Sequence, residues 1–120
     1  MPTMSKEILS GSTNGRGIIV TQTTSGAAVT IHTATSGGSN TDIDEIFIYA
    51  SNPTSTQRLL TIEFGGATVP DDQIAVQVPA HTTMLVVPGL IMRAGLELRA
   101  FCSDNASVTL HGFVNRIDQS

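Results

Sequence analysis

The side chains best able to carry out acid–base, nucleophilic or metal chemistry are three histidines and a single cysteine: His32, His81, His111 and Cys102. No two of these lie at the spacing of metal ligands, so we expect solvent-exposed or hydrogen-bonded histidines instead of a metal centre. His32 and His111 fall on the polar faces of two expected strands, where they would meet if those strands paired. Cys102 lies on the same expected strand face as Leu98 and Ala100 and has no activating base nearby, which predicts a small buried hydrophobic side chain instead of a nucleophile.

Carboxylates cluster around the start of an expected strand, at Asp42, Asp44 and Glu45. Alternating carboxylates in a loop can bind a hard cation such as calcium, but this cluster lacks the glycine and the distal glutamate of an EF-hand loop. We therefore interpret them as charges at a strand edge, where they discourage pairing with other chains. The Asp71–Asp72 pair follows Pro70 and is typical of a turn.

Motifs for phosphate binding and for serine catalysis are missing from the sequence. The glycine pairs at 37–38 and 65–66 are not followed by the Lys-Ser/Thr ending of a P-loop. No serine lies in a nucleophile elbow. We predict a non-enzymatic protein with no catalytic residues, no bound metal and no cofactor.

Most of the chain consists of short runs in which apolar and polar residues alternate, as in Val29–Thr33 and Ile74–Val78. Successive side chains of a strand point to opposite faces, so a period of two predicts half-buried strands. Gly, Pro, Ser and Asn separate the runs, and no stretch has a helical period. The sequence predicts an all-β fold, a single antiparallel β-sandwich of jelly-roll type, with an immunoglobulin-like sandwich as the alternative. The expected strands are 18–24, 28–35, 43–51, 58–64, 74–78, 82–87, 95–102 and 107–117, with 90–92 a candidate extension of the sixth.

The expected strand at 43–51 is apolar on both faces. Ile46 and Ile48 lie on one face, whereas Phe47 and Tyr49 lie on the other. A strand that is apolar on both sides is typically central in its sheet. The face that carries Phe47 and Tyr49 is therefore a candidate contact surface for a partner.

The first seventeen residues show no strand alternation and are rich in Gly, Ser, Thr and Asn. We predict a flexible N-terminal arm at 1–17 followed by the sandwich domain at 18–120. The apolar pair Ile8 and Leu9 could dock on a neighbouring protein, and a leader without structure is the alternative.

Charge and hydropathy exclude two classes of partner. Charged residues make up 13% of the chain, the net charge is −4, and the arginines are scattered around a single lysine, so no basic stripe is available for nucleic acid. The longest apolar run, 84–92, is too short to span a membrane. Residues 1–10 lack the features of a secretory signal, so we expect a soluble protein made in a cytoplasm. The sparse charge also indicates that part of the surface is covered by another protein.

Several strings in the last two-thirds of the chain carry a resemblance to a known group of proteins. They are DEIFIYASN at 44–52, LTIEFGG at 60–66, PGL at 88–90 and GFVNRI at 112–117. In these strings the chain resembles small β-rich virion proteins encoded among the head genes of tailed bacteriophages. The resemblance implies a capsid decoration, or cement, protein, in which trimers bridge neighbouring capsomers at three-fold or quasi-three-fold positions of the shell. It carries over no functional residue, because such proteins have no catalytic set.

Three functions compete at this point. The first is a non-enzymatic virion protein, most simply a homotrimer, that binds the major capsid protein on the capsid surface. The second is a receptor- or carbohydrate-binding sandwich of a phage fibre or spike, although the scarcity of Trp and Tyr argues against it. The third is a small cupin-type metalloenzyme. For the first, the residues we expect at the protein interface are Ile8, Leu9, Phe47, Tyr49 and Phe113.

Overall fold

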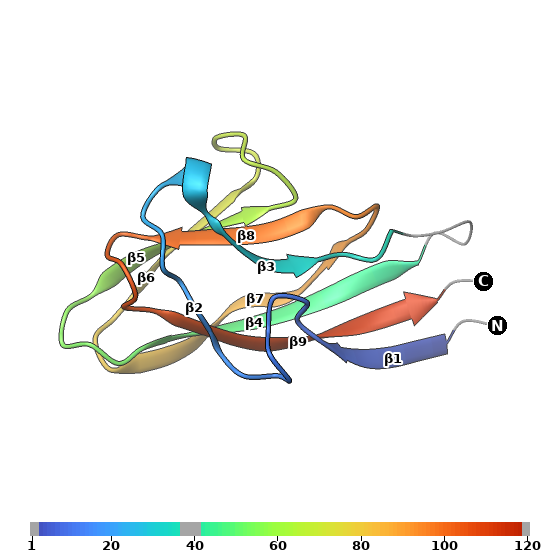
Figure 1. The fold of residues 1–120 in the computed structure, drawn as a ribbon, viewed down its shortest axis with the longest axis horizontal. Helices are drawn as coiled ribbons and strands as arrows, with labels where there is room; N and C mark the ends of the chain where they lie inside the picture. Colours follow the sequence, from blue (N-terminus) through green and yellow to red (C-terminus); the bar gives the residue numbers. More distant parts are fainter. Residues whose placement is uncertain (1–2, 37–41, 119–120) are drawn as a thin grey trace.

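The computed structural model describes residues 3–36 and 42–118, which form two antiparallel sheets packed face to face (Figure 1). The elements are β1 (Thr3–Ile8), β2 (Ile18–Ile19), the 3₁₀ helix η1 (Ser25–Ala27), β3 (Val29–Thr33), β4 (Ile43–Asn52), β5 (Arg58–Phe64), β6 (Gln73–Val78), β7 (Thr82–Met92), β8 (Glu97–Cys102) and β9 (Thr109–Asp118). Sheet A has the order β1-β9-β4-β7, and β2 also pairs with β9. Sheet B has the order β3-β8-β5-β6.

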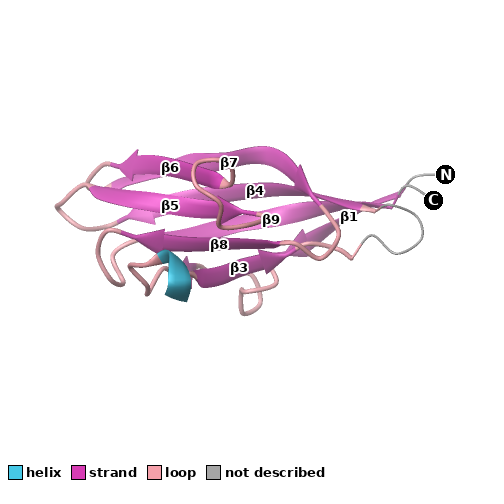
Figure 2. Cartoon of the chain, turned by 90° about the horizontal axis from the view of Figure 1, so that it is seen from above, coloured by secondary structure: helices cyan, strands magenta, loops and turns pink. Residues whose placement is uncertain are grey.

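The strands pair like one long hairpin that has been folded over on itself. The innermost pair is β5 with β6, followed outward by β4 with β7, β3 with β8, and β2 with β9. Successive pairs alternate between sheets B and A, so the strands of the two sheets lie over one another in matching order (Figure 2). This nesting defines a jelly roll. The predicted all-β sandwich is therefore confirmed, and the immunoglobulin-like alternative does not describe it.

The core lies between the sheets and is built from aliphatic side chains. In β4 the inward residues Ile46, Ile48 and Ala50 are fully buried, as the alternation predicted. Ile62 of β5 faces them from the other sheet and is fully buried as well. Cys102 is buried and free, in agreement with its expected role as a small hydrophobic side chain.

Strand positions agree closely with the sequence pattern in the second half of the chain. The expected strand at 58–64 coincides with β5. The expected strand at 82–87 and its extension at 90–92 form the single strand β7, which is bulged where it passes β4. Gly89 adopts φ +92° at one bulge, so a residue unrestricted by a Cβ is needed there. The glycine pair at 37–38 lies outside the described residues.

The N-terminal segment differs from the prediction. Residues 3–8 form β1, which pairs along its whole length with β9, and Leu9 is 1% exposed in the core. The expectation of a flexible arm is therefore wrong for residues 3–9, and the expectation that Leu9 contacts a partner is wrong too. Edge strands pair through their backbone, so a mostly exposed strand needs no apolar alternation to form. Met1 and Pro2 lie outside the described residues.

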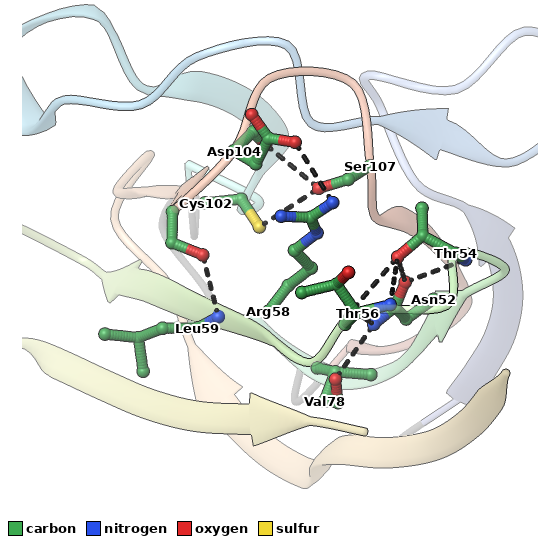
Figure 3. A network of polar contacts seen from close by, with 10 residues as sticks. Asn52, Thr54, Thr56, Arg58, Leu59, Val78, Cys102, Asp104 and Ser107 are labelled. Atoms are coloured by element: carbon green, nitrogen blue, oxygen red, sulfur yellow. Dashed lines mark hydrogen bonds and ion pairs between the residues drawn. The ribbon is translucent and has the colours of Figure 1, made fainter. Parts of the chain in front are cut away.

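A polar network fixes the loops at the end of the sandwich that lies away from the chain termini (Figure 3). The buried side-chain amide of Asn52 donates to the carbonyl oxygens of Thr56 and Val78, and its Oδ1 accepts from the backbone N–H of Thr54. These bonds satisfy the backbone of the turn between β4 and β5. The bond to Val78 also connects that turn to the end of β6.

Candidate functional site

The outer face of sheet A is unusually apolar for an exposed sheet face. Strand register places Phe47 of β4 opposite Phe113 of β9, and Phe113 opposite Ile8 of β1. Tyr49 lies in the next row, opposite Leu85 of β7. We call this surface the apolar face, and its residues are Met4, Ile8, Ile43, Phe47, Tyr49, Leu85, Ile91, Phe113 and Ile117.

Much of the apolar face is open to solvent. Met4 is 66% exposed, Ile91 56% and Ile8 52%, although these are large hydrophobic side chains. Scattered exposed apolar residues are ordinary, but a contiguous apolar patch on one face of a soluble domain marks a contact surface. Register sets Ile8, Phe113 and Phe47 in one apolar row that continues to Pro88 of β7. The polar row of Lys6, Asn115 and Glu45 lies between it and a second apolar row, formed by Met4, Ile117 and Ile43.

A pair of stacked phenylalanines forms the centre of the apolar face. The rings of Phe47 and Phe113 are 4.9 Å apart between centroids and 17° from parallel. The Lys6 ammonium lies 4.3 Å from the centroid of the Phe113 ring, at cation–π distance. A Cβ at Gly112 would overlap the backbone carbonyl of Phe47, so the strands that carry the two rings approach as closely as they do only with glycine there.

Charge is almost excluded from the apolar face. Among the described residues, register places only Lys6 and Glu45 on it as charged groups. Glu45 accepts a hydrogen bond of 3.1 Å from the side-chain amide of Asn115, its neighbour across the strands. Depletion of charge with enrichment of aromatic residues is the composition of an interface core.

The outer face of sheet B has the opposite character. Its outward residues include Thr61, Glu63, Arg99 and Gln77. Glu63 is buried on this side and accepts a hydrogen bond from the hydroxyl of Ser25 in η1. Leu59 and Phe101 also lie on this side, but the outer face of sheet B is more polar than that of sheet A, which is therefore better suited to apolar contact.

The structure brings together four of the five residues expected at a protein interface. Ile8, Phe47, Tyr49 and Phe113 all lie on the apolar face, although they come from three strands. Leu9 follows Ile8 by one residue and points the other way, into the core. Whether a partner covers the apolar face stays a prediction.

A second set of polar residues, which the sequence did not reveal as a unit, joins the two sheets near the chain termini. His32 of β3 and Asp44 of β4 are both buried, and the imidazole Nε2 lies 2.9 Å from a carboxylate oxygen of Asp44. Arg116 of β9 binds the same carboxylate through two nitrogens, at 2.8 and 3.0 Å. The backbone N–H of Thr35 also donates to it. Asp44 is therefore an internal anchor, and its interpretation as a strand-edge charge is wrong.

These contacts keep Asp44 ionised. Burial alone would raise the pKa of its carboxyl, but hydrogen bonds from Arg116, His32 and the Thr35 amide outweigh that effect and hold the pKa below its usual value. The pKa of Arg116 is raised above its usual value, chiefly by the hydrogen bond to Asp44 and against the opposing effect of burial. The site is thus a stable carboxylate–guanidinium pair with a histidine attached.

The histidine network does not have the geometry of a nucleophile and its base. A serine, Ser10, does approach the free imidazole nitrogen, but its backbone N–H donates to Nδ1 at 3.0 Å. The Ser10 hydroxyl instead accepts from the backbone N–H of Thr33 at 2.6 Å. A catalytic serine would need its hydroxyl on the imidazole, so the residues hold the chain together instead of activating an oxygen.

The other chemistry-bearing residues stay apart. His32 and His111 lie in different sheets, and His111 is exposed on the outer side of sheet A, opposite Tyr49. His81 is exposed in the turn between β6 and β7. Asp72 accepts from the backbone N–H of Thr68, as expected for a turn. Within residues 3–36 and 42–118 no three potential metal ligands cluster and no pocket opens.

The fold and the apolar face together define the chain as a jelly-roll sandwich with one apolar outer face. Comparison with protein-family models, with curated proteins and with solved structures gives no match. None of the helices in the described part of the chain is long and apolar enough to cross a membrane.

Proposed function

We propose that this protein is a non-enzymatic structural protein of a phage virion, which attaches to the assembled capsid through the apolar face and stabilises the shell. The observation that carries the proposal is the gathering of Ile8, Phe47, Tyr49 and Phe113 on one charge-poor sheet face. The partner on the shell is the major capsid protein. The protein is made in the host cytoplasm and works on the capsid surface.

The size of the apolar face supports attachment by several copies at once. Four strands about 4.8 Å apart and about ten residues long give the outer side of sheet A roughly 600 Å², which is an upper bound for the apolar face. A standard interface buries about 800 Å² per partner, and association costs at least about 4 kcal/mol before any gain appears. One copy would therefore hold on weakly, whereas linked copies gain affinity through effective concentration. We propose a homotrimer, with the apolar face buried partly between copies and partly against the capsid.

The receptor- or carbohydrate-binding alternative is less well supported by the aromatic residues. Sugar rings stack on open aromatic faces, but Phe113 is flanked by Phe47 on one side and by the Lys6 ammonium on the other. Tyr49 is the only tyrosine of the chain, and tryptophan is lacking from the sequence. This arrangement suits packing against another protein better than it suits a saccharide.

Cosedimentation with capsids tests the proposal. The probe is a shell assembled from the major capsid protein of the phage that carries this gene, mixed with wild-type protein, with Leu85→Ser, or with Leu59→Ser. Leu85 lies on the apolar face and is 42% exposed, whereas Leu59 lies on the outer face of sheet B and is 39% exposed, so the two changes are matched in residue type and exposure.

We expect Leu85→Ser to weaken shell binding at least about tenfold, because several linked copies each lose part of a half-buried leucine. Leu59→Ser should bind like the wild type. Equal binding by both variants, or absence of wild-type binding, would refute the proposal. Light scattering on the free protein tests the trimer separately, and a monomer at tens of micromolar, about the range of weak association, would contradict it.

A further inference from the structure

The N-terminal segment crosses from one sheet to the other immediately after β1 (Figure 1). Leu9 enters the core, Ser10 binds β3 through both its N–H and its hydroxyl, and the backbone N–H of Gly11 donates to the carbonyl of Ile31 at 2.9 Å. A Cβ at Gly11 would lie 2.6 Å from the carbonyl oxygen of Thr30, so the segment lies directly against the β3 backbone. These contacts hold the end of β1 to sheet B.

β1 itself is an edge strand with few other attachments. Its described partner strand is β9, and five of its six residues are exposed. It nevertheless supplies Met4, Lys6 and Ile8 to one side of the apolar face. Strands of this kind open locally at low free-energy cost unless a neighbouring contact fixes them. The position of one quarter of the apolar face therefore depends on the pairing of β1 with β9 and on the contacts of residues 9–11.

One of those contacts depends on the protonation of His32. Because Ser10 donates its N–H to Nδ1, this nitrogen carries no proton, and the ring is the neutral tautomer with its proton on Nε2, directed at Asp44. A second proton on the ring would sit on Nδ1 and face the Ser10 N–H across 3.0 Å. Donor would then oppose donor, and the hydrogen bond to Ser10 would be lost.

The charged groups around the imidazole come from three elements. Asp44 of β4 attracts a proton to the ring, and Arg116 of β9 opposes it by neutralising the same carboxylate. Glu7 of β1 and Asp42 act on Arg116 from further away. From β8, the residue opposite His32 is the apolar Leu98. The carboxylate that contacts the ring is therefore shared with a guanidinium.

We propose that His32 is the positioning residue of the apolar face: its neutral imidazole holds Ser10 and so helps to keep β1 in sheet A, and protonation of the ring makes β1 open more often. The proposal rests on the proposed function only for its consequence, namely that acid lowers the share of molecules in which Met4 and Ile8 are in place on the contact surface. The release itself is a property of the free protein. It can be measured with no capsid present.

The tautomer is tested first, by long-range ¹H–¹⁵N NMR of the histidine rings at pH 7.5. We expect the His32 ring to be neutral with its proton on Nε2. A proton on Nδ1, or an imidazolium, at that pH would overturn the proposal, because neither form can accept from Ser10. The exposed His111 provides the internal reference for a ring in solvent.

Hydrogen exchange then follows β1 between pH 7.5 and pH 5, with rates corrected for the intrinsic effect of pH. We expect the protected amides of β1 to lose roughly five- to tenfold of their protection, the equivalent of about one net hydrogen bond. The midpoint of this loss should coincide with the titration of the His32 ring seen by NMR in the same wild-type sample. Unchanged protection, or a midpoint that departs from the ring titration, would overturn the proposal.

Two variants separate the contacts of the two ring nitrogens. His32→Asn places an amide oxygen near the position of Nδ1 and cannot titrate in this range, so β1 should keep one level of protection at both pH values. His32→Gln reaches Asp44 but offers no acceptor to Ser10, so β1 should be released at both. If acid releases β1 in His32→Asn as well, another group is responsible and the proposal fails. If β1 behaves as expected but capsids are not bound, only the proposed function fails.

Discussion

Leu9 provides the sharpest test of the N-terminal segment, because its neighbour Ile8 is a natural control. Leu9 is 1% exposed between the sheets, whereas Ile8 is 52% exposed on the apolar face. Truncation of a buried leucine to alanine costs the transfer free energy of the lost atoms and leaves a cavity, together about 2.7–5 kcal/mol. We therefore expect Leu9→Ala to lower the free energy of unfolding by about 3–5 kcal/mol.

Ile8→Ala should cost much less. Roughly half of the isoleucine is already in water, so only about half of the 1.5–3 kcal/mol for full burial can be lost, about 1 kcal/mol. For a chain of 120 residues, each kcal/mol shifts the thermal midpoint by about 4 °C, so the two variants should differ by roughly 10 °C. The chain has no tryptophan, so unfolding in urea and by heat is best followed by far-ultraviolet circular dichroism.

The outcome that would refute this reasoning is specific. If Leu9→Ala and Ile8→Ala cost equally little, Leu9 does not fill the core and residues 1–17 behave as the flexible arm that their composition suggested. In that case a chain lacking residues 1–17 should keep its thermal midpoint. The structure leads us to expect instead that this truncation destabilises the fold severely, since it removes both β1 and the Leu9 side chain.

Five further substitutions test other parts of the structure. The pKa of Asp44 is lowered in the folded protein, so the stability that its carboxylate contributes is complete above about pH 4 and is lost as the pH falls through the lowered pKa. Urea denaturation from pH 6 to pH 2 should show this loss. Asp44→Asn should be less stable than wild type at pH 6, and its stability should change less with pH. Ile62→Ala should cost about 2–5 kcal/mol, and Val76→Ala, at a partly buried position, about 1–3 kcal/mol. A larger loss for Val76→Ala than for Ile62→Ala in chemical denaturation would contradict the burial assigned to the two residues. Gly112→Ala should destabilise the β4–β9 pairing by more than about 1 kcal/mol, because its Cβ would overlap the Phe47 carbonyl. Gly26 has open space around it, so the control Gly26→Ala should stay within about 0.5 kcal/mol of wild type. Thermal unfolding compares the two variants.

The sequence was a good guide wherever a strand has one buried and one open face. In β6 the alternation alone gives the strand position and the side that faces the core, because the core accepts only every second residue. In β5 the alternation gives the strand position as well, although the outward Thr61 and Glu63 are buried too. The Gly and Pro residues between the alternating runs were equally informative about where strands end or bend, and Pro88–Gly89 lies at a bulge within β7. The nested pairing that makes the fold a jelly roll depends on contacts between distant strands, and strand number was the only sequence signal for it.

The strand β1 could not be recognised from the sequence, because it forms without burying one of its faces and so needs no alternation of apolar and polar residues. It is held by backbone hydrogen bonds to β9, and its mostly exposed residues carry no alternation. Leu9, the one buried residue next to it, belongs to the crossing between the sheets and not to the strand. A single apolar side chain gives no period to detect, so the pattern of residues 1–17 indicated a loop.

The anchor at Asp44 did leave a signal in the sequence. Asp44 has the same parity as Ile46, Ile48 and Ala50, so the alternation of β4 itself places it on the buried side. A carboxylate on the inner face of a strand requires a cationic or donor partner. What the sequence could not supply is the identity of those partners, since His32 and Arg116 come from strands 12 and 72 positions away.

The apolar face is hard to explain as a by-product of folding. Side chains on the outer side of β4 contribute nothing to the core, because their inward neighbours Ile46 and Ile48 already fill it. Thr, Lys or Glu at the outward positions would form the same strands and would improve solubility. The outer face of sheet B has that polar character and belongs to the same jelly roll, so the fold itself does not demand an apolar exterior. We therefore predict that the stacked pair of Phe47 and Phe113, with Lys6 over one ring, contacts another surface.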